Sequence, residues 1–312
     1  MADLPLISVG IPTFNRPEGL RHTLSRITQQ TYSNLEIIIS DNQSDAAEAV
    51  KAVVDSFAVT DKRIRFTRQS QNLGSVGNFH FLVNQASGDY FLWAADDDEV
   101  ELDYIATLFS ALSKHPKASV AMTGYDVTDT MSQPPIFTNL TKPMYSLCGA
   151  TPFERLRNYI AQPDHLGKSR LAWGMFRRPS IVKAFADCIA AYRGAPPLIW
   201  PDLPIEVRVL AQGDLVIDPK VLFHVALLPT SQGKKDMAQR IAKMMEIARR
   251  CSDSLRAVVA DADLTESERS TLMEMLKAKY RKDRFQLFVY YGVISKVPWL
   301  ARWVKKLLYA LN

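Results

Sequence analysis

Four consecutive acidic residues give the strongest chemical signal in the sequence. Asp96, Asp97, Asp98 and Glu99 directly follow the apolar run Tyr-Phe-Leu-Trp-Ala-Ala at residues 90–95. A solvated acidic turn would have the same composition. However, one or two carboxylates together with substrate phosphates are the ligands that hold Mg²⁺ in many proteins. The run is therefore a candidate site for a divalent metal ion bound to a diphosphate.

Polar residues also follow two other apolar runs. Asp41 comes directly after residues 35–40, and Thr13 and Asn15 lie in the segment 11–16, Ile-Pro-Thr-Phe-Asn-Arg. These side chains can hydrogen-bond a ribose or the edge of a base. The alternatives are an Asx turn or helix N-cap at Asp41, and a plain strand-to-helix turn with Asn15 as the N-cap. The residues alone leave both interpretations open.

The order of strands and helices indicates how these side chains are brought together. Apolar β-type runs at 6–11, 35–40, 64–68 and 90–94 alternate with helical patterns at 16–29, 45–57 and 76–86. This alternation predicts right-handed βαβ units in a doubly wound sheet. Ligands of such sheets bind beyond the carboxyl ends of the strands, so we expect the loops 12–16, 41–45 and 95–99 to form the site. Asp45 and Glu48 have the spacing of a capping box for the second helix.

The second half of the chain is less regular. Residues 126–150 are rich in Thr, Pro and Ser, which predicts a loop excursion. We expect helices at 152–162, 180–191 and 203–212, and a closing pair of strands at 215–217 and 221–225. Two further helices are expected within residues 234–280.

The net charge of +5 is the sum of two unlike parts. Residues 1–233 carry a net charge of −3 and most of the Gly and Pro, whereas residues 234–312 carry +8. We therefore expect a domain boundary between 1–233 and 234–312. The three cysteines have the spacing of neither a disulfide framework nor a zinc site. A secretory signal and an apolar run of ~18 residues are both missing, which indicates a cytoplasmic protein.

Five motifs together resemble family 2 glycosyltransferases. They are Leu-Ile-Ser-Val-Gly-Ile-Pro-Thr-Phe-Asn-Arg at 6–16, Leu-Glu-Ile-Ile-Ile-Ser-Asp-Asn-Gln-Ser at 35–44, the segments 72–77 and 88–90, and the acidic run at 96–99. The resemblance covers about residues 4–125 and continues more loosely to about residue 226. It implies the α/β GT-A fold, with a doubly wound mixed sheet and here a C-terminal helical extension. It is greatest to bacterial enzymes that decorate surface polysaccharide, including the abequosyltransferase-like branch.

The resemblance also implies roles for individual residues. The acidic run matches the DxD motif, which holds Mg²⁺ or Mn²⁺ on the diphosphate of a nucleotide-sugar donor. Ala95 stands where the family has its first aspartate, so the metal ligand is ambiguous between Asp97 and Asp98. Asp41 matches the carboxylate that binds the base, usually uracil, which favours a UDP-sugar. The residues implied to contact the donor are Pro12, Thr13, Asn15, Asp41, Asn72, Gly74 and Asp96.

Three further candidates come from the looser part of the resemblance. Asp202 is the candidate catalytic base, although Pro201 replaces the Glu of the family's Glu-Asp pair; a helix N-cap is the alternative, and Glu206 is the second candidate base. His224 is a candidate third metal ligand, but a His in an apolar strand is more often structural. The segment 173–178, Trp-Gly-Met-Phe-Arg-Arg, resembles the acceptor side, where an Arg can meet phosphate or acceptor charge.

The resemblance implies an inverting transfer of a sugar from a nucleotide-sugar donor to a hydroxyl of a glycan or lipid-linked acceptor. There are two alternative functions. A sugar-nucleotide pyrophosphorylase should have a Gly-rich signature after the first strand, which the segment 11–16 lacks. A degenerate glycosyltransferase that serves as a membrane-associated scaffold is kept open by Ala95 and Pro201. The loop 72–78 lacks the dinucleotide and P-loop spacings.

The C-terminal residues indicate a partner other than nucleic acid. Apolar residues recur at helical spacing from Leu300 to Leu311, with Arg302, Lys305 and Lys306 on the other face. A basic amphipathic helix of this kind can lie on an anionic membrane, so residues 285–312 are expected to contact the inner face of the cell membrane. The alternative is a helix that packs on the catalytic domain or on a second copy of the chain.

Overall fold

The structure is a computed structural model that describes residues 4–129, 136–163, 166–191, 202–227 and 237–287. The chain divides into two compact units, residues 1–229 and 230–312. The boundary that we expected after residue 233 lies in the segment 228–236, outside the described residues.

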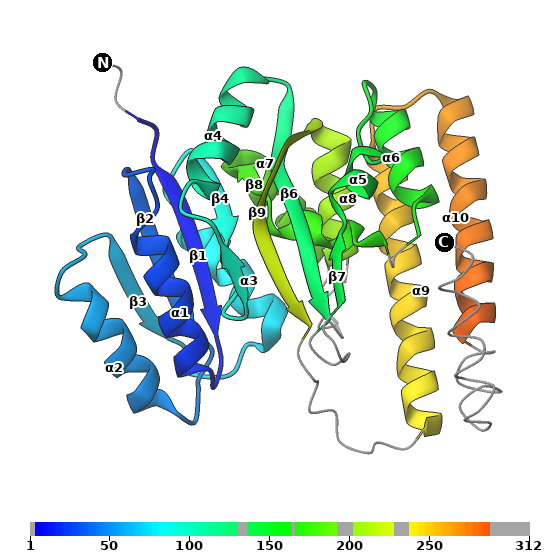
Figure 1. Cartoon of the computed structure of the whole chain (residues 1–312). Coiled ribbons are helices and arrows are strands. Elements are labelled where there is room, and N and C mark those ends of the chain that lie inside the picture. The colour runs from blue at the N-terminus through cyan, green and yellow to red at the C-terminus, as the bar shows by residue number, and fades with distance from the viewer. Residues whose placement is uncertain (1–3, 130–135, 164–165, 192–201, 228–236, 288–312) are drawn as a thin grey trace. The chain divides into compact units, whose positions relative to one another are not determined.

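The first unit is built on a mixed sheet with nine strands among the described residues (Figure 1). Its first half contains four parallel strands in the order β3-β2-β1-β4. The winding therefore reverses between β1 and β4, which is the position where such sheets bind ligands. The elements of this half are β1 (Ile7–Thr13), α1 (Pro17–Thr28), β2 (Leu35–Asp41), α2 (Ala47–Ala58), β3 (Ile64–Arg68), α3 (Gly74–Gln85) and β4 (Tyr90–Trp93).

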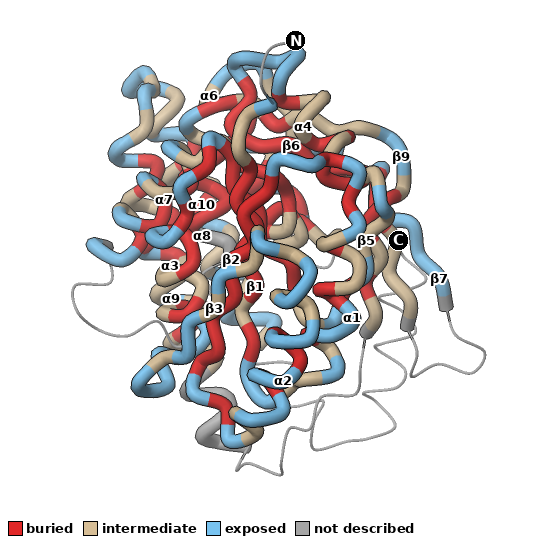
Figure 2. The backbone as a smooth tube through the Cα atoms, turned by 90° about the vertical axis from the view of Figure 1, so that its left-hand side faces the viewer, coloured by how far each residue is buried: buried red, intermediate tan, exposed pale blue. Residues whose placement is uncertain are grey.

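Burial explains why the strands of this half were recognisable in the sequence. All seven residues of β2 are buried, as are all four of β4, and Figure 2 shows the buried tube running along β1 and β2. A parallel strand covered on both faces needs a nearly continuous apolar run. The four observed strands agree with the predicted ones to within two residues at each end.

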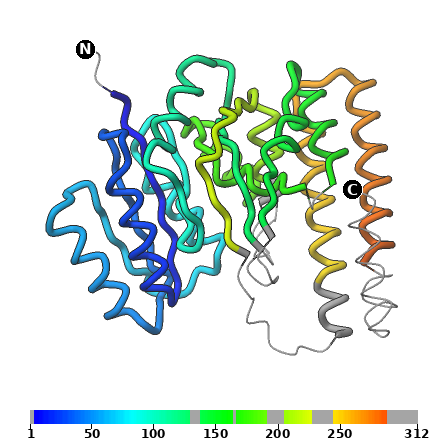
Figure 3. Tube along the Cα trace, viewed as in Figure 1, coloured from blue at the N-terminus to red at the C-terminus, as the bar shows by residue number. Residues whose placement is uncertain are grey.

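The second half of the sheet joins segments that are far apart in the chain. β6 pairs with β9 in parallel and with β8 antiparallel, and β8 joins them to β4. Figure 3 shows β6 and β9 side by side despite their different colours. The elements of this half are β5 (Asp98–Val100), α4 (Tyr104–Lys114), β6 (Ala118–Asp129), β7 (Ile136–Asn139), α5 (Thr141–Tyr145), α6 (Pro152–Ala161), the 3₁₀ helix η2 (Lys168–Trp173), β8 (Met175–Arg177), α7 (Arg178–Ala191), α8 (Asp202–Gln212) and β9 (Asp214–Leu227).

Three sequence predictions about local structure were wrong. The segment 126–150 contains the end of β6, the strand β7 and the helix α5 in addition to loops. The expected pair of strands at 215–217 and 221–225 is one strand, β9, with a register shift where Gly124 approaches the carbonyl groups of Pro219 and Lys220. The capping box is absent, because α2 begins after Ala46 and no side chain caps it.

A buried carboxylate joins three segments at the amino end of the parallel strands. Glu36 Oε1 accepts hydrogen bonds from Ser8 Oγ at 2.5 Å, from the backbone N–H groups of Ser87 at 2.6 Å and Gly88 at 3.2 Å, and from Ser87 Oγ at 2.9 Å. Its Oε2 pairs with Arg65 at 2.9 Å. Burial alone would raise the pKa of Glu36, but the hydrogen bonds and Arg65 outweigh it and hold the pKa below its usual value.

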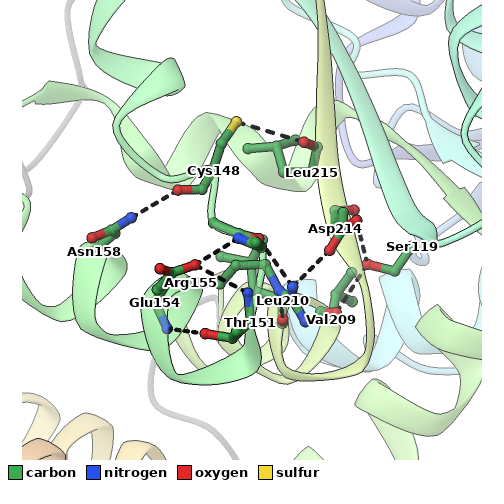
Figure 4. Close-up of polar contacts among 12 residues, drawn as sticks. Ser119, Cys148, Thr151, Glu154, Arg155, Asn158, Val209, Leu210, Asp214 and Leu215 are labelled. Carbon is green, nitrogen blue, oxygen red and sulfur yellow. Dashed lines mark hydrogen bonds and ion pairs between the residues drawn. The ribbon is translucent and has the colours of Figure 1, made fainter.

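A buried arginine ties together the second half of the unit (Figure 4). Arg155 in α6 donates to the carbonyl oxygens of Leu210 at 2.7 Å and Gly149 at 3.0 Å, and it pairs with Asp214 at 2.6 Å. A capping box between Thr151 and Glu154 starts the same helix. These contacts fix α6 against the end of α8 and the start of β9.

The second unit contains two long helices, α9 (Met237–Asp261) and α10 (Glu266–Leu287), as expected for residues 234–280. Thr265 and Glu268 form reciprocal hydrogen bonds at the start of α10. The amphipathic pattern that begins at Leu300 lies outside the described residues. Within the part of the chain that the structure describes, no helix is both long and apolar enough to cross a membrane.

Candidate functional site

The predicted loops meet at the carboxyl ends of β1, β2 and β4. Pro12 and Thr13 end β1 opposite Ser40 and Asp41 of β2. Thr13 is buried and its hydroxyl donates to Asp96 Oδ2 at 3.2 Å. This bond spans the position between β1 and β4 where the strand order reverses, so the first and third predicted loops form one site.

Asn15 organises the loop after β2 and does not cap α1. Its side-chain carbonyl accepts hydrogen bonds from the backbone N–H groups of Asp45 at 2.7 Å and Ala46 at 3.3 Å. Its own backbone N–H donates to Ser44 Oγ at 2.7 Å, and its φ is 57°. Asn tolerates this left-handed conformation better than most residues. The residue before α1 is Arg16, which makes no capping bond.

Asp41 is fully buried and only half satisfied. Its Oδ1 accepts a hydrogen bond from the backbone N–H of Ser44 at 3.0 Å, as in an Asx turn. Its Oδ2 accepts no hydrogen bond, and Arg68 Nε lies 3.4 Å from it as an ion pair. A buried carboxylate oxygen without a hydrogen-bond donor is costly, and such groups recur at binding sites. The turn and the binding interpretations of Asp41 are therefore compatible, because each uses a different oxygen.

The loop after β3 is tied to the same edge. Asn72 Oδ1 accepts from the backbone N–H of Gly74 at 2.8 Å and from Asn42 Nδ2 at 3.1 Å. Gly74 begins α3 with a φ of 69°, which glycine adopts without strain. The structure thus places Asn72 and Gly74 beside the residue that follows Asp41.

The acidic run contains one buried aspartate, Asp98, one partly exposed aspartate, Asp96, and one exposed aspartate, Asp97. Burial raises the pKa of Asp96 to about 6, against the opposing charge of Arg16. Burial, and next the charge of Asp97, raise the pKa of Asp98 to about 7. Arg16 Nη1 lies 3.2 Å from Asp96 and 3.1 Å from Asp97, and Arg170 lies 3.9 Å from Asp98. Carboxylates crowded in this way are stabilised by added positive charge.

The donor atoms of this loop fit a hard divalent cation. Among the described residues, no group of three or more His, Cys, Asp or Glu side chains is placed to hold a metal ion by itself. Mg²⁺ needs no such group, because one or two carboxylates and the phosphates of a substrate suffice. Asp97 and Asp98 supply carboxylate oxygens of this kind, one at the surface and one below it.

His224 does not lie with these aspartates. In the β5–β9 ladder Asp98 is opposite Val225, and Glu99 is opposite His224. Successive side chains of a strand point to opposite faces, so Asp98 and His224 face away from each other. His224 instead contacts Asp126 at 3.0 Å and Glu101 at 3.5 Å. The register therefore gives no support for grouping His224 with the DxD carboxylates, and its role as a metal ligand stays a prediction.

The two candidate bases have different positions. Asp202 is the first residue of α8, but its side chain lies outside the described residues, so its role stays a prediction. Glu206 is fully buried, and its two oxygens accept from the hydroxyl of Tyr159 at 2.6 Å and the backbone N–H of Ala172 at 3.0 Å. These bonds give Glu206 a structural role and remove the reason to consider it as the base.

Arg177 and Arg178 lie at the opposite end of the sheet from the site. Arg177 is opposite Tyr90, the first residue of β4, and its guanidinium donates to the carbonyl oxygen of Ala118 at 2.8 Å. Arg178 donates to the carbonyl oxygen of Gly88 at 2.7 Å. The expectation that an arginine of the segment 173–178 meets substrate charge was wrong, because β8 runs antiparallel to β4.

Three arginines of the site were not predicted as site residues. Arg16, Arg68 and Arg170 lie in or beside the loops of the site, and each pairs with at least one of its aspartates. Arg16 belongs to the first motif and could have been noted from its place at the end of that loop. Nothing in the spacing of Arg68 or Arg170 distinguishes them from other surface arginines.

Known proteins share this fold and part of this sequence. The chain is 37% identical over 106 residues to GalNAc(5)-diNAcBac-PP-undecaprenol beta-1,3-glucosyltransferase of Campylobacter jejuni, covering 34% of each chain. It is 33% identical over 99 residues to the putative colanic acid biosynthesis glycosyl transferase WcaA of Escherichia coli, covering 32% of this chain and 35% of WcaA. The matched part thus spans about a third of the length of these relatives.

Solved structures resemble a larger part of the chain. TarS of S. aureus (residues 1–349) superposes with a TM-score of 0.63 at 14% identity, covering 93% of this chain and 75% of that one. The mannosyltransferase PcManGT of Pyrobaculum calidifontis, in complex with GDP-Man and Mn²⁺, has a TM-score of 0.54 at 14% identity and covers 100% and 82%. The expected α/β GT-A fold with a helical C-terminal part is confirmed. The sequence model "Glycosyl transferase family 2" matches residues 8–178, more than half of the chain, and the chain therefore belongs to glycosyl transferase family 2.

Proposed function

We propose that this protein transfers a sugar, with inversion, from a nucleotide-sugar donor to a hydroxyl of a glycan or lipid-linked acceptor during assembly of bacterial surface polysaccharide. Family membership supports sugar transfer, and the printed names of two relatives refer to an undecaprenol-linked glycan and to colanic acid. The abequosyltransferase-like branch stays a prediction from the motifs. The family match gives no support to the pyrophosphorylase alternative.

The observation that carries the proposal is the oxygen of Asp41 that accepts no hydrogen bond. Asp41 Oδ2 is buried, accepts no hydrogen bond and lies where the loops after β1, β2 and β3 converge. A carboxylate is only an acceptor, so it selects a ligand edge that donates an N–H. The N3–H of uracil is such a donor, and we therefore favour a UDP-sugar. TarS, one of the structures of the same fold, was solved in complex with UDP-GlcNAc.

The aspartates after β4 complete the donor site in this proposal. Thr13 connects Asp96 to the end of β1, so the base and diphosphate regions are contiguous. Asp97 and Asp98 would hold Mg²⁺ or Mn²⁺, and this ion would supply positive charge for the departing diphosphate. Arg170, 3.9 Å from Asp98, adds a cation on the other side of the loop.

Asp202 is our proposed catalytic base. It begins α8, in the position that the family motif gives to the base. It would remove the proton from the acceptor hydroxyl while that oxygen attacks the anomeric carbon. The acceptor would be presented at the inner face of the membrane, and we propose that residues 285–312 make this peripheral contact.

A transfer assay tests the base. Asp202→Asn should lower kcat by about 10²- to 10⁴-fold, because a positioned general base typically contributes that factor. Donor affinity should stay within about twofold, since the substitution removes an interaction with the nucleophile only. Asp187→Asn, on the exposed face of α7 and paired with Lys183, is the matched control. Wild-type turnover in Asp202→Asn would refute the assignment.

A thermal-shift screen of nucleotide sugars with Mn²⁺ tests the function itself. A ligand that binds only the folded protein raises its apparent stability, so at least one donor should raise the Tm. A bound donor that is neither hydrolysed nor transferred would favour the degenerate scaffold. No shift with any nucleotide sugar would refute the proposed donor class.

A further inference from the structure

An arginine of the chain occupies the side of the acidic run where a cation is expected. Arg16 Nη1 lies 3.2 Å from Asp96 Oδ1 and 3.1 Å from Asp97 Oδ2, so a single nitrogen bridges two aspartates. The side chain of Arg16 is 40% exposed. A cation that enters this loop must compete with a guanidinium that is already there.

The geometry of this contact is that of a replaceable cation. Among the described residues, the one side-chain hydrogen bond of Arg16 runs from Nη1 to Asp97 Oδ2 at 3.1 Å, and its ion pair with Asp96 is also shortest through Nη1. Arg63 and Asp61 show the contrast within the same molecule, because Arg63 Nε and Nη2 both bind the carboxylate, and Nη2 also binds the carbonyl oxygen of Thr28. Bidentate pairs of that kind are the strong ones. The exposed contact through one nitrogen is weaker and is more easily broken.

Asp96 and the backbone of the acidic loop are held by contacts that do not involve Arg16. Thr13 Oγ1 holds Asp96 Oδ2, and Thr23 Oγ1 donates to the carbonyl oxygen of Ala95 at 2.8 Å. The loop also packs closely on α1, because a Cβ on Gly19 would lie 2.1 Å from the carbonyl oxygen of Asp96. Departure of the guanidinium would therefore leave the loop backbone and the Asp96 carboxylate in place.

We propose that Arg16 is an internal counter-ion that holds Asp96 and Asp97 in the donor-free protein and is displaced when a divalent ion enters with the nucleotide. Once released, its guanidinium is within reach of the diphosphate, where anionic oxygens replace the lost carboxylates. The metal ion alone then binds weakly, because it must displace Arg16 while no diphosphate is present to pair with the released guanidinium. The ion and the nucleotide together bind cooperatively. This inference rests on the proposed donor site.

Binding of Mn²⁺ to the full-length protein without nucleotide tests the inference. Arg16→Met keeps the apolar stem and removes the charge, and Arg21→Met is the control, since Arg21 on α1 pairs only with Glu18 among the described residues. The paramagnetic resonance signal of free Mn²⁺ reports the bound fraction. Arg16→Met should bind nucleotide-free Mn²⁺ at least about fivefold tighter than wild type, a typical size for coupled sites. Arg21→Met should match wild type.

The second measurement is the effect of UDP on the same Mn²⁺ titration. UDP should tighten Mn²⁺ binding by a larger factor in wild type than in Arg16→Met, because only the wild type releases Arg16. Nucleotide-free Mn²⁺ affinity in Arg16→Met within twofold of wild type, or weaker, overturns the inference. Absence of Mn²⁺ binding in both proteins overturns it as well. Failure of wild type to bind any nucleotide sugar refutes the proposed function instead, and the nucleotide-free comparison still decides the role of Arg16.

Discussion

The two ends of the parallel strands bury carboxylates in opposite ways. At the amino end, Glu36 accepts five hydrogen bonds, one of them from its ion-pair partner Arg65, and its pKa is held below the usual value. At the carboxyl end, Asp41 has an oxygen without a hydrogen bond, and burial raises the pKa values of Asp96 and Asp98. The same sheet thus has an amino end where the buried carboxylate is saturated with hydrogen bonds, and a carboxyl end where the carboxylates are under-satisfied because they lack hydrogen bonds or counter-charge.

This difference separates stability from binding. A saturated carboxylate stabilises the fold, and its removal leaves donors unpaired. An under-satisfied carboxylate costs stability until a ligand supplies the missing donor or cation, which is the usual condition of functional sites. Substitutions at the amino end should therefore lower the stability of the fold, whereas substitutions at the carboxyl end should lower the affinity for ligand.

The largest effect is expected at Asp98. Asp98→Asn should weaken donor binding in the presence of Mn²⁺ by at least about 100-fold, because even outer-shell substitutions at metal sites cost 10- to 100-fold. Its Tm should be unchanged or higher, since the variant removes a buried negative charge beside Asp97. Calorimetry with UDP and Mn²⁺ gives the affinity, and Glu99→Gln is the control on the exposed next residue. Equal affinity in Asp98→Asn and wild type would exclude the metal role of Asp98.

Asp41→Asn should have a smaller effect that does not depend on the metal. Hydrogen bonds to a charged group contribute about 1.5–3 kcal/mol, so UDP affinity should fall roughly 10- to 100-fold. The loss should be equal with Mn²⁺ and with EDTA, because the contact is to the base. The amide oxygen can still accept from Ser44, so the fold should be retained. A large drop in Tm with unchanged UDP affinity would show that Asp41 stabilises the fold and does not bind the base.

Glu36→Gln should show the reverse pattern. The variant should lose about 2 kcal/mol of unfolding free energy, since it removes a charged acceptor from several hydrogen bonds, and it should bind UDP as wild type does. Chemical denaturation measures the first quantity and calorimetry the second. Asp55→Asn, which breaks an exposed pair with Lys51, should change stability by only about 0.5 kcal/mol or less.

The pH dependence of the same variant adds a test. Because the folded pKa of Glu36 is lowered, its contribution is fully present above the unfolded pKa and is lost as the pH falls through the folded pKa. The difference in unfolding free energy between wild type and Glu36→Gln should therefore be lost on acidification below about pH 4.3, the usual pKa of Glu. An advantage that stays constant down to pH 2 would contradict the role of its charge.

The sequence predicted the parallel half well because burial on both faces leaves a local pattern. It missed β6 and divided β9 into two strands, because these strands pair across about a hundred residues and carry Thr, Asp and Pro. Asp41 and Asp96–Asp98 were predicted because strand ends bind ligands in this class of sheet. The arginines that pair with these aspartates were not predicted, because the direction of β8 decides whether Arg170 or Arg177 reaches the site.

The Arg155 contacts have a consequence for the order of folding. They join residues separated by 55 and 59 positions, whereas the β1–β2 and β2–β3 pairings join residues 28 and 27 positions apart; the β1–β4 pairing spans 83 positions. Closing longer loops costs more chain entropy before any contact repays it, and folding slows as contacts become less local. We expect the local β1–β2 and β2–β3 pairings to form first, and the β6–β9 pairing, which joins residues 95 to 98 positions apart, to form later. Pulse-labelled hydrogen exchange should therefore protect the amides of β1 and β2 before those of β6 and β9, and the opposite order would refute this sequence of events.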